Sequence, residues 1–119
     1  MTRSTMQAGS DFPLSPAVRS AYQSLYDALQ SALDETMDAA AVEAMNPCLA
    51  MIDQVLTKDD IYRLASNTIN LTALKRQIAD TNKGLKTLRE EVESIASHIE
   101  LAGDILAGID KVLTMVPGL

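Results

Sequence analysis

An apolar stripe from Leu71 to Val116 constrains the fold of this chain more than any other sequence feature. Counting from Leu71 in alternating steps of three and four residues reaches fourteen positions, and twelve of them carry a large aliphatic side chain. The other two positions are Thr81 and Ala102. A repeat of about 3.5 residues is typical of helices that pack along a common seam. This half of the chain is therefore predicted to be helical and buried against other helices.

The composition favours an all-α fold over a β-sandwich. Of the 119 residues, 47% are hydrophobic but only 3% are aromatic, and Leu, Ile, Val, Met and Ala supply the apolar side chains. Strands favour aromatic and β-branched residues, whereas this set suits closely packed helices. We expect a flexible N-terminal arm over residues 1–14 and a single helical domain over 15–119. The N-terminus lacks the apolar core of a secretory signal, so a cytoplasmic protein is expected.

The first half of the chain contains signals for three helix starts. Ser15 followed by Pro16 predicts a first helix that runs to about residue 45, because Pro47 disfavours helical geometry before it. A short connecting helix over 46–57 is predicted next, with Pro47 at its first position. Thr57 is then expected to cap a third helix whose first turn carries Asp59 and Asp60.

The segment around Gly84 leaves two architectures open. Glycine after Asn82-Lys83 is a good helix stop, yet the apolar spacing continues through it unbroken. With a turn there, helices over 16–45, 58–81 and 85–116 form an antiparallel bundle of three long helices plus the short connecting helix. Without the turn, a helical hairpin with a continuous 58–116 helix forms a coiled-coil oligomer.

The charge of the chain limits the classes of molecule that it can bind. The net charge of −6 argues against nucleic acid, which binds proteins through Lys and Arg, and no apolar run is long enough to span a membrane. Residues 27–53 and 90–110 are acidic and lack Lys and Arg, whereas 75–89 is basic. The acidic segments favour a basic protein partner, because complementary charge steers association.

Candidate chemical groups are few. Cys48 is a candidate reactive thiol, because a position near a helix start can lower the pKa of a thiol; its structural interpretation is a small buried hydrophobic residue. His98 is the single histidine, and nothing places it beside Cys48. No Glu-x-x-His pair or phosphate-binding loop is present. We therefore expect no enzyme activity, metal or cofactor.

The prediction of function depends on the apolar stripe. The main hypothesis is a non-enzymatic interaction module that binds another protein or another copy of itself, such as an acidic partner that neutralises or chaperones its target. The candidate interaction face is Val92, Ile95, Ile99, Leu106, Ile109 and Leu113. The alternatives are a self-assembling structural coiled coil and a thiol-dependent enzyme or redox sensor that uses Cys48.

Overall fold

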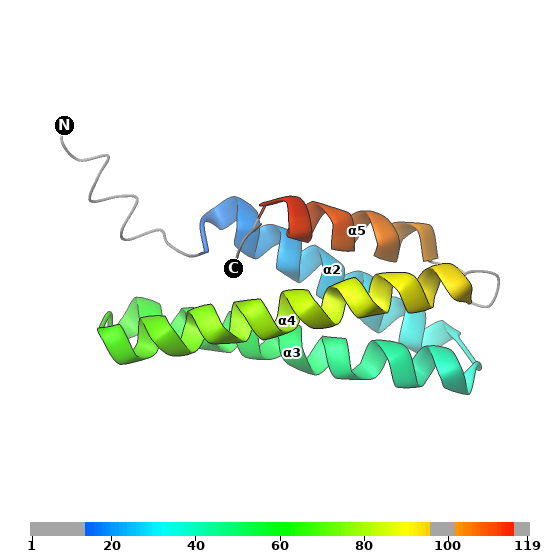
Figure 1. The fold of residues 1–119 in the computed structure, drawn as a ribbon, viewed down its shortest axis with the longest axis horizontal. Coiled ribbons are helices and arrows are strands. Elements are labelled where there is room, and N and C mark those ends of the chain that lie inside the picture. Colours follow the sequence, from blue (N-terminus) through cyan, green and yellow to red (C-terminus); the bar gives the residue numbers. More distant parts are fainter. Residues whose placement is uncertain (1–13, 96–101, 116–119) are drawn as a thin grey trace.

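The protein is an all-α bundle of four helices, as a computed structural model shows for residues 14–95 and 102–115 (Figure 1). Successive helices run antiparallel, and 91% of the described residues are helical. The helices are α2 (Pro16–Glu35), α3 (Ala39–Leu64), α4 (Thr68–Ser94) and α5 (Ala102–Met115). The predicted fold class is confirmed, but most of the predicted helix boundaries are wrong.

One apolar core lies between the four helices. Each helix packs against the next along the chain, and α5 also packs against α2, which closes the bundle. The largest fully buried side chains come from every helix and include Tyr22, Leu25, Leu29, Met45, Ile52, Leu74, Ile78, Leu85, Ile105 and Ile109. The apolar stripe is therefore buried mainly within the chain itself.

Helix α2 begins where the sequence predicts and ends ten residues early. The Ser15 hydroxyl accepts from the Val18 amide at 3.3 Å, and Pro16 is the first helical residue. The helix stops at Glu35 because Thr36 is extended, and a new helix starts after Asp38, whose carboxylate accepts from the Ala40 amide at 2.8 Å. The apolar spacing continues across this turn, so the sequence did not indicate that Asp38 caps a new helix.

The predicted short helix over 46–57 is wrong, because α3 continues through Pro47. Proline inside a helix removes one hydrogen bond and clashes with the carbonyl one turn earlier, here that of Glu43. Both residues are exposed, so water can reach that carbonyl. Met45 and Cys48, on either side of Pro47, are buried in the core. Core packing on the inner face thus outweighs the cost of proline on the outer face.

The predicted start of a helix at Thr57 is also wrong. Thr57 and Asp59 lie inside α3, and the next helix starts at Thr68, where the Asn67 side chain accepts from the Asn70 amide at 2.8 Å. Asp59 is not a first-turn capping charge but a buried carboxylate, 1% exposed.

No break occurs at Asn82-Lys83-Gly84, and α4 runs through all three residues. The glycine serves a different purpose. A Cβ atom added to Gly84 would collide with the Met51 side chain of α3, and the Cys48 sulfur lies 3.8 Å from the Gly84 carbonyl oxygen. Gly84 therefore leaves room for the end of the Met51 side chain between α3 and α4, because glycine has no Cβ.

The predicted helices 85–116 and 58–116 are both wrong, since α4 ends at Ser94 and its cap is Ile95. Helix α5 then buries Ala102, Ile105, Ile109 and Val112, so its core face is rotated from the face that the heptad count gives. Residues 1–13 of the expected arm lie outside the described residues. Leu14, the last residue assigned to that arm, is fully buried in the core.

Candidate functional site

The interaction face predicted from the sequence lies largely in the core. Val92 and Ile109 are fully buried by this chain. Ile95, Leu106 and Leu113 are half-buried and pack against the same core. Ile99 lies outside the described residues. Among the described residues of this face, a partner could reach only the half-buried ones without opening the bundle.

Cys48 does not lie near a helix start, because α3 begins nine residues earlier at Ala39. Its side chain is 3% exposed. Burial and, to a smaller extent, the negative charge of Glu91 together raise the pKa of the thiol from 9.0 to about 11. At neutral pH the group is therefore a protonated thiol, a weak nucleophile. His98 lies outside the described residues.

An ion cluster around the buried carboxylate of Asp59 joins α2 to α3, close to Leu14. One carboxylate oxygen of Asp59 accepts from Arg19 of α2 at 2.5 Å and from Arg63 at 2.7 Å. Arg63 also donates to the backbone carbonyl of Leu14, and Arg19 pairs with Asp60 at 3.0 Å. Each charged group of this cluster is bonded to another group of the same chain, so the cluster stabilises the fold.

A second buried polar pair joins α2 to α4. The Tyr22 hydroxyl donates to the side-chain oxygen of Asn82 at 2.7 Å, and both residues are at most 4% exposed. Burial holds the pKa of Tyr22 far above its usual range, although the hydrogen bond with Asn82 acts to lower it. The phenol stays neutral and positions the two helices relative to each other.

Acidic residues from four segments meet at one end of the bundle. This acidic end is formed where the turn between α2 and α3 approaches the end of α4 and the start of α5 (Figure 1). Lys and Arg are absent from residues 20–57 and 90–110, so these segments bring no basic side chain to it. The acidic end comprises Asp34, Glu35, Asp38, Glu43, Glu90, Glu91, Glu93 and Asp104.

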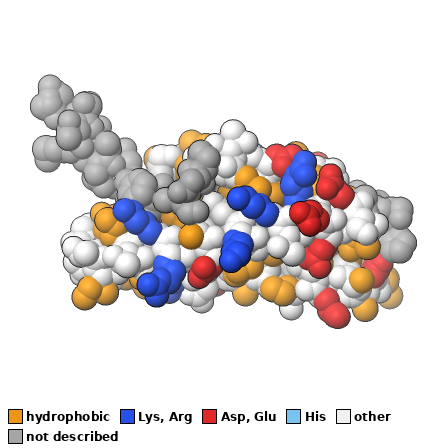
Figure 2. All heavy atoms as spheres, in the orientation of Figure 1, with side chains coloured by type: hydrophobic (Ala, Val, Ile, Leu, Met, Phe, Trp, Pro, Cys, Tyr) orange, Lys and Arg blue, Asp and Glu red, His pale blue; other side chains and the backbone are white. Residues whose placement is uncertain are grey.

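Acidic and basic side chains are therefore unevenly distributed over the surface. In Figure 2 most of the red side chains on this face lie on the right, over the acidic end, whereas most of the blue ones lie on the left and in the centre and one lies among the red ones. Arg89 marks the boundary, where it pairs with Asp110 at 2.7 Å and with Glu93 at 3.7 Å. The neighbouring carboxylates raise the pKa of this guanidinium, with Asp110 as the largest cause.

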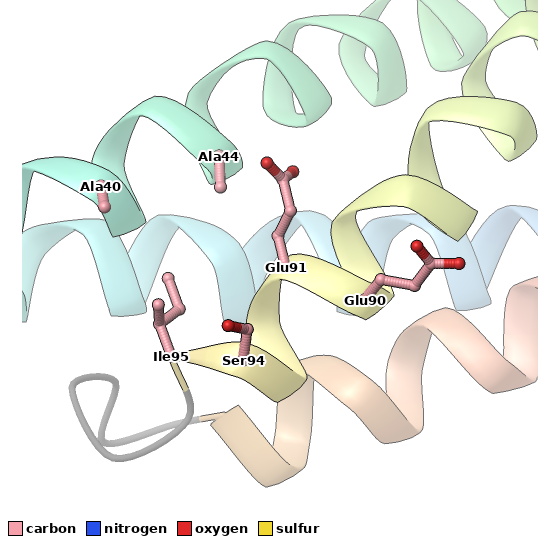
Figure 3. A pocket seen from close by; sticks show the side chains of 6 residues that line it. All are labelled: Ala40, Ala44, Glu90, Glu91, Ser94 and Ile95. Carbon is pink, nitrogen blue, oxygen red and sulfur yellow. The ribbon is translucent and has the colours of Figure 1, made fainter.

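An open hollow of about 330 Å³ lies within the acidic end, between the start of α3 and the end of α4. Figure 3 shows Glu91 pointing from α4 toward Ala44 of α3, with Ile95 facing the same gap. The residues that line the hollow are Ala40, Ala44, Glu90, Glu91, Ser94 and Ile95. The sequence analysis missed this hollow; its only signal was a pair of alanines spaced one helical turn apart.

The opposite end of the bundle exposes apolar side chains. Ile61 and Leu64 at the end of α3 are 46% and 88% exposed, and Ile69 at the start of α4 is 79% exposed. We call these three residues the apolar tip. Their side chains are a candidate contact surface that the sequence analysis did not identify, because they lie outside the regular stripe.

Two further tests concern the described residues alone. No group of three or more His, Cys, Asp or Glu side chains in residues 14–95 and 102–115 is arranged to hold a metal ion. None of the helices described there is long and apolar enough to cross a membrane. No protein family, curated protein or solved structure matches the chain.

Proposed function

We propose that this chain is a helical protein–protein interaction module whose acidic end binds a basic surface of another protein. One observation carries the proposal: the fold brings the acidic residues at the end of α2 and the start of α3 to the same end of the bundle as those at the end of α4 and the start of α5. A field of one sign concentrated on one surface attracts a partner of opposite charge. Such steering raises association rates by a factor on the order of 10 to 1000 at low salt.

The form of the module suits binding better than catalysis. The buried polar groups Asp59 and Tyr22 are used in contacts between helices, and the thiol of Cys48 is protonated. The carboxylates of the acidic end, by contrast, lie mostly on the surface of a rigid helical frame, as Glu43, Glu90 and Glu91 illustrate. A partner can meet these groups without a rearrangement of the core.

Site-specific photo-crosslinking in cells of the source organism tests this proposal. A photoreactive amino acid replaces exposed Ala39 at the acidic end, and a matched protein carries it at exposed Thr72, near the other end of α4. We expect capture of a protein from position 39 and not from position 72, through a peptide rich in Lys and Arg. The purified pair should bind about tenfold more weakly when salt is raised from low to physiological concentration.

Two results would overturn the proposal. One is a partner captured only from position 72. The other is a captured partner whose affinity does not change with salt or with a combined Glu43→Lys, Glu90→Lys and Glu93→Lys substitution.

Self-association is the second candidate function, and the apolar tip is the observation that favours it. Leu64 and Ile69 are the most exposed large aliphatic side chains of the helices that the structure describes, and burying them between two copies would be favourable. Light scattering of the wild-type protein and of a Leu64→Ser, Ile69→Ser variant tests it. A dimer that dissociates in the variant supports this function, and a wild-type monomer at high concentration rejects it.

A further inference from the structure

The hollow combines an apolar wall with carboxylates at its rim. Ala40 and Ala44 lie one turn apart on α3 and form one side with their methyl groups, and half-buried Ile95 closes the end. Because both α3 residues are alanines, the side chains between α3 and α4 leave a space of about 330 Å³. A space of that size accommodates one long side chain from another molecule.

The carboxylates of the hollow are at most weakly compensated by the described part of the chain, since Glu90 contributes least among the acids that raise the pKa of Arg89. Glu90 and Glu91 are exposed, and neither forms an ion pair with a described Lys or Arg. Arg89, the residue before Glu90, is paired with Asp110 on α5 and with Glu93 on α4. Glu91 points instead across the gap toward Ala44 (Figure 3).

We infer that the hollow receives an arginine or lysine side chain of the protein partner. Such a side chain has an apolar stem and a charged head, and it buries the stem where the head can reach a charge. The stem would lie against Ala40, Ala44 and Ile95. The head would donate to the carboxylate of Glu91, with the Ser94 hydroxyl as a second acceptor and Glu90 adding negative charge at the rim.

This inference rests on the proposed function, since it names the group through which a basic partner is recognised. It makes a narrower claim, because general attraction to the acidic end requires no defined pocket. Filling the hollow without changing any charge separates the two ideas. Ala44→Met does so, and Ala40→Met does the same from a more exposed position if the first variant fails to fold.

The probe is a short alanine-based peptide with one central arginine, titrated into isotopically labelled protein and followed by amide chemical shifts. A second peptide carries citrulline, which keeps the shape of arginine and removes its charge. We expect the arginine peptide to shift the amides of Ala40, Ala44, Glu91 and Ser94, and the citrulline peptide to leave them in place. Equal shifts with the two peptides, or none at the hollow, would overturn the inference.

The variants give a second readout. Glu91→Gln and Ala44→Met should each weaken binding of the arginine peptide by about five- to tenfold. Glu43→Gln removes the same charge from the same end outside the hollow, and it should change the affinity less than about twofold. Circular dichroism checks that each variant is folded.

Failure of the inference can be told apart from failure of the proposed function. If Ala44→Met and Ala40→Met bind the peptide as the wild-type protein does, the hollow is not the site and this inference is wrong. The crosslinks from position 39 then decide independently whether the proposed function is correct.

Discussion

The guanidinium of Arg19 on α2 lies 2.5 Å from the buried carboxylate of Asp59 on α3, forty residues away in the sequence. The two partners differ in their access to water, because the Asp59 side chain is 2% exposed and the Arg19 side chain is 33% exposed. Loss of the arginine partners should therefore lower the free energy of unfolding more than loss of the carboxylate does, since a buried charge without a partner is strongly destabilising.

Removal of both arginines tests this asymmetry. We expect Arg19→Ala combined with Arg63→Ala to lower the free energy of unfolding by about 3–5 kcal/mol, because Asp59 stays buried and unpaired. Asp59→Ala should cost about 1–2 kcal/mol, because the freed guanidinium groups can turn to water. Urea denaturation of the three proteins provides the comparison. A larger loss in Asp59→Ala than in the double variant would contradict this account of the cluster.

Gly84 should tolerate no large side chain, although it lies in a continuous helix. Leucine is a better helix former than glycine, so any loss in Gly84→Leu must come from packing against Met51 of α3. We expect a loss of about 1–3 kcal/mol, partly recovered when Met51→Ala is added. If the glycine were instead a helix stop, Met51→Ala would give no recovery. Thermal denaturation of the two single variants and the double variant distinguishes these outcomes.

Cys48 should make the fold less stable at alkaline pH. Its pKa is raised in the folded protein, from 9.0 to about 11, so the unfolded chain loses the thiol proton first. The stability that depends on the protonated thiol is fully present below pH 9.0. It is lost as the pH rises to about 11, which lowers the free energy of unfolding by roughly 1–3 kcal/mol. Urea midpoints measured from pH 7 to 11 should fall less in Cys48→Ala than in the wild-type protein. An equal fall in both proteins would show that other groups cause the loss.

The same Cys48→Ala variant should bind the partner as tightly as the wild-type protein does. The thiol is buried and its hydrogen-bond partner is the Gly84 carbonyl within this chain. An affinity measurement on the captured partner checks this. Loss of binding by a folded Cys48→Ala protein would favour the thiol hypothesis.

Ile109 and Ile69 provide a matched test of what the apolar residues do. Ile109 is fully buried and Ile69 is 79% exposed. Ile109→Asp places a charge in the core without a partner, which should cost several kcal/mol and leave the chain unfolded at every protein concentration. Ile69→Asp should keep the helical circular dichroism and the melting temperature. A smaller but folded species from Ile109→Asp would instead indicate that another chain covers this residue.

The helical fold class and the start of α2 were determined by the sequence alone. Ser15 and Pro16 mark the start of α2, because a hydroxyl acceptor and a preset backbone angle act within a few residues. The scarcity of aromatic residues and the regular aliphatic spacing were sufficient for an all-α bundle. These effects are local or depend on the chain as a whole, so they need no knowledge of which helix lies beside which.

The tertiary structure decided the boundaries of the helices and the site. Pro47 and Gly84 are signals for breaks, yet both lie inside helices, because core packing around Pro47 and close contact with Met51 at Gly84 outweigh local preference. The hollow required Ala44 and Glu91 to be brought together from α3 and α4. Spacing along one helix cannot specify which residues face each other across two helices, since that depends on how the whole core packs.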